Sequence, residues 1–151
     1  MTLIHLTTFI AAPRERVFDL SRSVDLHRRS MNRYGEEAVA GVRNGMMELN
    51  DTVTWKAKHL MKQRLLKVKI TQLLKPEFFA DEMVEGDFRM MKHEHYFKSV
   101  DNGTLMIDQF RYEVPYGLVG RMVDRLYLRA YMTRLLMERN AVIKRECEAI
   151  S

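Results

Sequence analysis

The chain of 151 residues has one cysteine, three prolines and no long hydrophobic run. The single cysteine, Cys147, excludes an internal disulfide, as is usual in a reducing compartment. No apolar run approaches the roughly 20 residues that a membrane helix needs, so we expect no integral membrane association. The first residues carry no basic leader and alternate between apolar and polar types, so we expect no secretory signal and a cytoplasmic protein.

The sequence also lacks repeats, low-complexity tracts and linkers, which predicts a single domain over residues 1–151. Apolar residues make up 46% of the chain and charged residues 30%, which excludes disorder across its whole length. The net charge of +5 comes from scattered lysines and arginines, and those in Lys67-Val68-Lys69 alternate along a predicted strand. Such alternation is typical of a solvated strand face rather than a basic patch, so we expect no nucleic-acid binding.

Hydrophobic periodicity predicts one strand, two short helices, six further strands and a long helix, in that order. Residues 2–10 alternate as a strand does, and their Thr, Ile and Phe residues favour that conformation. Pro13 can open a helix over residues 14–20, and Ser23 can cap a second helix that ends near Met31. The six further strands are predicted at residues 37–42, 51–60, 64–74, 77–84, 88–98 and 104–114.

The last two of these strands are predicted to form a hairpin, because Asp101-Asn102-Gly103 links them. Asn-Gly favours a two-residue turn, since both residues tolerate positive φ. A turn centred on these two residues predicts the cross-strand pairs Phe97–Asp108, His95–Phe110 and His93–Tyr112.

Residues 118–148 contain no proline and are rich in Leu, Met, Arg, Glu and Ala, which predicts one helix of about 30 residues. Its apolar residues form a wide stripe, which suits a helix gripped by a curved sheet. The stripe consists of Val119, Met122, Val123, Leu126, Ala130, Leu135, Met137 and Val142. A solvated face is predicted for Arg121, Arg125, Arg129, Arg134 and Arg139. A curved sheet leaves space beside such a helix, and we expect a ligand cavity there.

Several short motifs follow one another along these elements. Two early ones are Ala12-Pro13-x-x-x-Val17-Phe18-Asp19 and Asn50-Asp51-x-Val53-Thr54-Trp55. The most specific stretch is Pro76-x-x-Phe79-x-Asp81-x-Met83-x-x-Gly86-x-Phe88. It leads into His93-x-His95-x-Phe97, Gly103-Thr104, Asp108 and Pro115-x-Gly117. Together with the element order, these motifs resemble the SRPBCC superfamily, also called START-like, over essentially the whole chain, and within it a bacterial polyketide-cyclase-like subgroup.

The resemblance implies an α+β helix-grip fold like that of the birch-pollen allergen. Such a fold has a curved seven-stranded antiparallel sheet around a long C-terminal helix, with two short helices after the first strand. The resemblance also implies a cavity whose partner is a lipid, steroid, polyketide or similar small hydrophobic molecule. It does not imply one activity, since one fold hosts many functions. The residue before Phe88 is often proline in the subgroup and is Asp87 here, which bears on a turn and not on chemistry.

Side chains on a strand alternate between its two faces, so Met91, His93, His95 and Phe97 share one face. If that face is concave, polar groups of the hairpin enter an apolar cavity, where methionines adapt to the shape of a ligand. The predicted ligand-binding residues are Trp55, His59, Phe79, Asp81, Met91, His93, His95, Phe97, Met106, Asp108, Phe110, Tyr112, Met122 and Leu126.

The polar members of this set allow three kinds of chemistry. A histidine oriented by Asp108 can act as a general base, with His93 and His95 as the catalytic candidates. The same two histidines and His59 can hold a metal ion, but the spacing signal is weak, and we predict neither a metal nor another cofactor. Finally, these groups can simply hydrogen-bond one another or the polar end of a ligand.

The leading interpretation is therefore a binding protein for a small hydrophobic molecule. One alternative is a cyclase- or dehydratase-like enzyme that uses a His–Asp pair. Another is a regulatory or structural partner-binding domain whose cavity is filled by its own side chains. Cavity volume separates the last from the others, because ligand sites measure roughly 300 Å³ or more. The sequence leaves the ligand, the reaction and the oligomeric state open.

Overall fold

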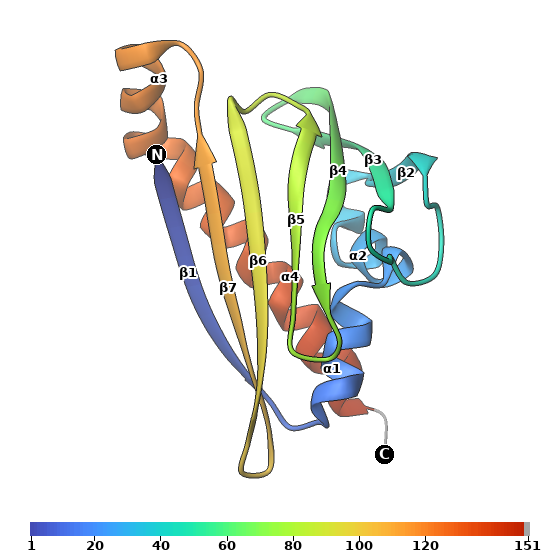
Figure 1. Cartoon of the computed structure of the whole chain (residues 1–151). Coiled ribbons are helices and arrows are strands. Elements are labelled where there is room, and N and C mark those ends of the chain that lie inside the picture. Colours follow the sequence, from blue (N-terminus) through green and yellow to red (C-terminus); the bar gives the residue numbers. More distant parts are fainter. Residues whose placement is uncertain (150–151) are drawn as a thin grey trace.

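A curved antiparallel sheet and a long C-terminal helix dominate the computed structural model, which describes residues 1–149 (Figure 1). The strands are β1 (Thr2–Ile10), β2 (Glu37–Gly41), β3 (Thr52–His59), β4 (Lys62–Leu74), β5 (Phe78–Glu85), β6 (Met90–Val100) and β7 (Gly103–Glu113). The helices are α1 (Arg14–Ser21), α2 (Val24–Ser30), the 3₁₀ turn η1 (Asn32–Tyr34), α3 (Gly117–Val123), the π-helical turn η2 (Asp124–Leu128) and α4 (Arg129–Ala149). The predicted element order and α+β architecture are confirmed.

The seven strands lie in the order β1-β7-β6-β5-β4-β3-β2, and every neighbouring pair is antiparallel. All neighbours except β1 and β7 also follow one another along the chain. Helix α4 contacts β1, α1 and α2. Figure 1 shows α4 running diagonally behind the sheet, with α1 beside its C-terminal end. The sheet therefore has one face turned toward helices, and its inward side chains can form a core.

The core follows from the period-2 alternation of the two longest hairpin strands. In β6 and β7 nearly every second residue is buried, and these residues include Met91, Phe97 and Phe110. Phe18 of α1 packs edge-on against Phe79 and Phe97, with ring centroids 5.6 and 5.3 Å apart. These aromatic rings fill the part of the concave space that lies next to α1.

The two short helices begin as the sequence predicts. Pro13 immediately precedes α1, and its fixed φ of −62° suits that position. The Ser23 hydroxyl accepts a hydrogen bond from the Leu26 N–H at 3.2 Å, which caps α2. None of the helices within residues 1–149 is long and apolar enough to cross a membrane.

The predicted register of the β6–β7 hairpin is wrong by two residues. Val100 pairs with Gly103, so the turn consists of Asp101 and Asn102, and Asn102 takes a φ of 65°. Gly103 belongs to β7 instead, where a Cβ would clash with the Ile10 carbonyl oxygen of β1. The observed pairs are Phe97–Met106, His95–Asp108 and His93–Phe110. A shift of two residues leaves every side chain on its predicted face.

The predicted apolar stripe of the long helix is wrong in the N-terminal half. The helical turns run from residue 117 to 149, but η2 interrupts the regular α-helix. The residues that turn inward there are Gly120 and Asp124, whereas Val119, Met122, Val123 and Leu126 are exposed, as is Met137 further along. Figure 1 shows α3 at the end of the sheet, past the start of β1, where it has little of the sheet to pack against.

Candidate ligand cavity

A cavity of about 320 Å³ lies between the concave face of the sheet and the long helix. Its walls are mainly apolar, and they come from α2, from strands β3 to β7, from η2 and from α4. The apolar lining includes Val24, Met47, Val53, Trp55, Val68, Ile70, Met91, Phe110, Leu128, Met132, Leu135 and Leu136. Its volume lies at the lower end of the range for small-molecule sites. The core is thus not completely filled by its own side chains.

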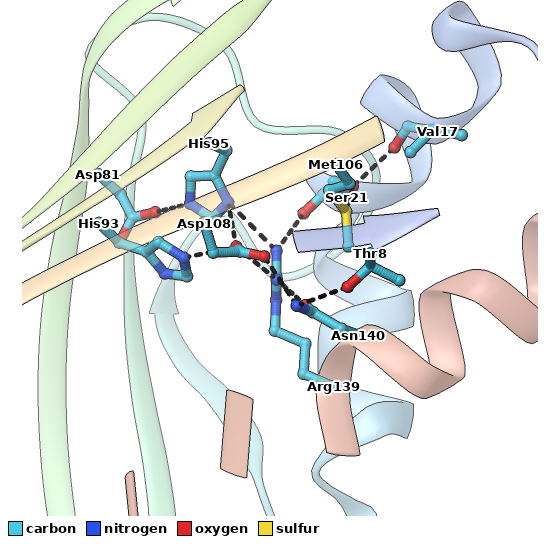
Figure 2. A network of polar contacts seen from close by, with 10 residues as sticks. All are labelled: Thr8, Val17, Ser21, Asp81, His93, His95, Met106, Asp108, Arg139 and Asn140. Carbon is cyan, nitrogen blue, oxygen red and sulfur yellow. Dashed lines mark hydrogen bonds and ion pairs between the residues drawn. The ribbon is translucent and has the colours of Figure 1, made fainter. Parts of the chain in front are cut away.

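The inner wall of the cavity carries two histidine–carboxylate pairs (Figure 2). His93 Nε2 lies 2.8 Å from Asp108 Oδ1, and His95 Nε2 lies 2.8 Å from Asp81 Oδ2. The imidazole rings stack on each other with centroids 3.7 Å apart, and Phe79 stacks on the far side of His95 at 4.0 Å. The alternation of β6 thus brings both histidines to the cavity, while Asp81 comes from β5 and Asp108 from β7. We call these four residues, together with Arg139 and Asn140, the inner cluster.

Arg139 of α4 is the buried cation of the inner cluster. Its guanidinium lies 3.4 Å from Asp108 Oδ1 and 3.4 Å from His95 Nδ1, and it donates to Asn140 Oδ1 at 2.8 Å. The Asn140 amide donates in turn to Asp108 Oδ2 at 2.7 Å. The predicted solvated position for Arg139 is therefore wrong. Its spacing from Leu136 and Ile143, three and four residues away, is the signal that places it on the buried side of the helix.

The environment fixes the charge state of the inner cluster. Burial, together with the neighbouring His93, lowers the pKa of His95 to about 3 against the opposing effect of Asp81. Burial acts to raise the pKa of Asp108, but the hydrogen bond from His93 and the Arg139 charge outweigh it and hold that pKa well below its usual range. The pKa of Asp81 is lowered in the same way, mainly by the hydrogen bond from His95. At neutral pH both carboxylates are ionised, and His95 is uncharged.

These charge states determine which nitrogen of His93 is free. An ionised Asp108 can only accept a hydrogen bond, so the proton of the His93 ring is on Nε2. The other ring nitrogen, Nδ1, has no hydrogen-bond partner among residues 1–149. Because His93 lines the cavity, Nδ1 is the ring nitrogen that can hydrogen-bond a group that enters the cavity.

The inner cluster also contains the residues that can hold a metal ion. Donor atoms of Asp81, His93 and His95 lie within 4.8 Å of one another, and these are donor types that divalent zinc accepts. The predicted third ligand, His59, lies elsewhere, next to Tyr131. Arg139 already supplies positive charge beside these groups, and a divalent cation there would be repelled by its guanidinium.

A second polar group, the outer cluster of His27, Glu36, His59 and Tyr131, lines another part of the cavity. The Tyr131 hydroxyl lies 2.8 Å from His59 Nδ1, and burial lowers the pKa of His59 against the opposing charge of Glu36. The Glu36 side chain is only 7% exposed, and its Oε1 lies 3.4 Å from His27 Nε2. Its Oε2 is buried without a hydrogen-bond partner among the described residues. Such a carboxylate is costly to bury, so a donor from a ligand would stabilise it.

The structure divides the predicted ligand-binding residues into three groups. Those that line the cavity are Trp55, His59, Phe79, Asp81, Met91, His93, His95 and Phe110. Those buried in the core outside it are Phe97, Met106, Asp108 and Tyr112. Of these, Asp108 hydrogen-bonds His93, which lines the cavity. The placement of Met122 and Leu126 at the cavity is wrong, because η2 turns Asp124 inward instead.

Sequence reasoning missed His27, Glu36, Tyr131 and Arg139. His27 stacks on Trp55 with centroids 4.4 Å apart, and its position on the short helix α2 depends on how that helix packs. Glu36 lies between η1 and β2, outside any periodic element. Only Arg139 carried a signal in its spacing, so the outer cluster could not have been assembled from the sequence.

No family model matches the sequence, and no curated protein matches it either. Solved structures do match over nearly the whole chain. TTHA0849 from Thermus thermophilus aligns with a TM-score of 0.76 at 19% identity and covers 99% of each chain. A START superfamily protein from Mycobacterium smegmatis aligns with a TM-score of 0.71 at 14% identity, again over 99% of each chain. The protein has the START-like, helix-grip fold.

One further helix-grip structure has two domains. It is the di-domain ARO/CYC StfQ from the steffimycin biosynthetic pathway, which aligns with a TM-score of 0.76 at 10% identity. The alignment covers 97% of the present chain and 50% of StfQ. These TM-scores establish the helix-grip fold that the sequence motifs predict. Because the identities are low, function has to be argued from the cavity.

Proposed function

We propose that the protein binds a small hydrophobic molecule that carries a hydrogen-bond donor at each of two ends. The observation that carries this proposal is the cavity of about 320 Å³, whose mainly apolar lining also includes residues of the inner and outer clusters. Apolar burial supplies the affinity, at roughly 25 cal/mol per Å² removed from water. The two polar clusters fix the orientation of the ligand.

The chemistry of both clusters favours donors over acceptors on the ligand. In this proposal an uncharged His93 presents Nδ1 as an acceptor beside the Asp81 carboxylate in the inner cluster, and the outer cluster presents the Glu36 carboxylate. A ligand carboxylate at the outer cluster would meet the buried, unpartnered Glu36 carboxylate, so fatty acids are disfavoured there. Hydroxyl groups on an aromatic or polycyclic body fit better. A hydroxylated polyketide belongs to this class, and the fold shared with the ARO/CYC StfQ is compatible with such a ligand.

The binding proposal is tested by native mass spectrometry together with a cavity-filling variant. Met132 lines the cavity from α4, so Met132→Trp is expected to fill it and to abolish any co-purifying small-molecule mass. Met137→Trp is the matched control, because Met137 lies on the exposed side of the same helix. Absence of bound mass, with no thermal shift on adding dihydroxyanthraquinone to either the wild type or Met137→Trp, would count against binding.

Calorimetry separates the proposed ligand class from fatty acids. Dihydroxyanthraquinone is expected to bind more tightly than palmitate. Glu36→Gln replaces a charged acceptor with a neutral one and is expected to weaken dihydroxyanthraquinone binding by about tenfold. Glu37→Gln is the control, since Glu37 is exposed and adjacent in sequence. Tighter binding of palmitate would contradict the proposed class without removing the cavity.

The second candidate function is general-base catalysis by His93. The specific observation in its favour is that Asp108 holds Nε2 of His93, a residue that lines the cavity, while Nδ1 has no hydrogen-bond partner among the described residues. That arrangement lets Nδ1 remove a proton next to a carbonyl, with the resulting imidazolium stabilised by Asp108. Abstraction of such a proton is the first step of an aldol-type cyclisation.

Deuterium exchange tests this second function without a known substrate. The wild type is expected to accelerate exchange of the α-proton of an aryl diketone in D₂O, followed by NMR. His93→Gln is expected to lose at least about a hundredfold of that acceleration, which is the usual contribution of a general base. His5→Gln is the control, because His5 is exposed on β1. Equal exchange rates with and without the protein would exclude the catalytic function and leave the binding proposal intact.

A further inference from the structure

The helical segment before α4 exposes an unusual number of large apolar side chains. Leu118 is 76% exposed, Met122 is 62% exposed and Leu126 is 75% exposed. We define the apolar helix face as Tyr116, Leu118, Val119, Met122, Val123, Leu126 and Tyr127. Apolar residues gathered in this way on a surface typically mark a contact site for another apolar surface.

The orientation of this face is fixed from the inside. A Cβ on Gly120 would clash with the Pro115 carbonyl oxygen, so the helix backbone approaches the preceding loop closely at that point. The Asp124 carboxylate accepts hydrogen bonds from the hydroxyls of Tyr112 and Thr2, which ties η2 to β7 and β1. With Gly120 and Asp124 held inward, the apolar helix face must point outward.

The exposed charges within the helical segment itself all have one sign. Between residues 116 and 130 the exposed charged side chains are Arg121, Arg125 and Arg129, and Asp124 is buried. At about 100° per residue, these arginines lie along one edge of the face. The segment is therefore an amphipathic helix whose exposed surface combines large apolar side chains with positive charge.

We propose that the apolar helix face binds the surface of a membrane that contains anionic lipid. Such a surface offers both an apolar layer for the leucines and methionines and negative charge for the arginines. A second copy of the chain is a poorer partner, because it would bring the same arginines into apposition. The net charge of +5 acts in the same direction. Leu128 and Met132, which follow on the same helix, line the cavity, so the docked face would lie next to the cavity wall.

Vesicle flotation tests this proposal with phosphatidylcholine vesicles that contain or lack phosphatidylserine. The wild type is expected to bind the anionic vesicles at least about tenfold more tightly than the neutral ones, with loss of binding at high salt. Leu118→Glu combined with Leu126→Glu is expected to abolish binding while leaving the thermal unfolding midpoint unchanged. The matched control is Leu74→Glu combined with Val84→Glu, which changes two exposed apolar residues of β4 and β5.

The proposal would be overturned if the Leu118→Glu/Leu126→Glu variant still bound anionic vesicles. It would also be overturned if the wild type bound neither vesicle type. Analytical ultracentrifugation tests the alternative that the apolar helix face binds a second copy of the chain. A wild-type dimer that only this double variant dissociates would overturn the membrane proposal by showing that the face binds a second copy instead. None of these outcomes depends on whether the cavity holds a ligand.

Discussion

Asp81 and Asp108 each hold one imidazole of the inner cluster, and Arg139 provides the positive charge near both. Buried charges of this kind are tolerated only when each is paired and hydrogen-bonded. The same pairing leaves Nδ1 of His93, a residue that lines the cavity, without a hydrogen-bond partner among the described residues. At the scale of single residues, structure and proposed chemistry therefore rest on the same few contacts.

His95 makes the stability of the protein depend on pH. Its pKa is about 3 when folded, against about 6.5 when unfolded, so the unfolded state alone takes up this proton between those values. This contribution to stability is fully present above the unfolded pKa and is lost as pH falls toward 3. The expected slope is up to about 1.4 kcal/mol per pH unit. Urea unfolding between neutral pH and the acid range measures it.

His95→Gln should remove that slope, because glutamine keeps a donor for Asp81 but does not titrate. His5→Gln, on the exposed side of β1, should retain the wild-type slope. Identical pH profiles for the wild type and His95→Gln would contradict the assignment of His95 as buried and uncharged.

Loss of Arg139 should be far more costly than loss of other arginines on the same helix. Arg139→Met leaves Asp108 and Asp81 without their nearby cation, and breaking a buried pair in this way costs about 3–5 kcal/mol of unfolding free energy. Arg125→Met changes an exposed residue of η2 and should cost less than about 0.5 kcal/mol. Chemical denaturation of both variants measures the difference, and equal losses would mean that Arg139 is not paired.

At the scale of elements, periodicity predicted the strands and the two short helices well. It failed where contacts with distant parts of the chain set the backbone conformation. The turn between β6 and β7 lies one residue earlier than Asn-Gly suggests, because Gly103 is needed where β1 passes close to β7. The long helix was predicted as one regular stripe, and η2 breaks that regularity. No local pattern reveals a π-turn that is held by Asp124 and a distant Tyr112.

Gly103→Ala tests the first of these contacts. The added methyl group would meet the Ile10 carbonyl oxygen and lie 2.9 Å from the Phe9 ring, so it should push β1 from β7 at a cost of about 3 kcal/mol. Gly35→Ala serves as the comparison, because Gly35 has a φ of 65° and no neighbouring atom within 4 Å among the described residues. It should cost only about 1 kcal/mol, from backbone strain. Equal losses in thermal or urea unfolding would contradict the close approach.

At the scale of the whole molecule, the sequence was sufficient for the helix-grip fold and for the shared face of His93 and His95, but it did not predict that Asp81 pairs with His95. His93 and His95 are two residues apart on β6, so strand alternation puts both on the buried face that lines the cavity. The outer cluster comes from α2, the loop before β2, the end of β3 and α4, and the mutual packing of these parts has no periodic signature. Arg139 was misplaced because arginine is normally a surface residue.

The central claim is that a hydroxyl-bearing hydrophobic molecule enters the cavity and hydrogen-bonds its inner wall. Nitrogen NMR of the histidine rings during titration with dihydroxyanthraquinone tests it most directly. The His93 Nδ1 resonance is expected to move on binding, while the resonances of exposed His5 stay unchanged. Saturable binding that leaves His93 unmoved, or movement of His5 alone, would contradict it.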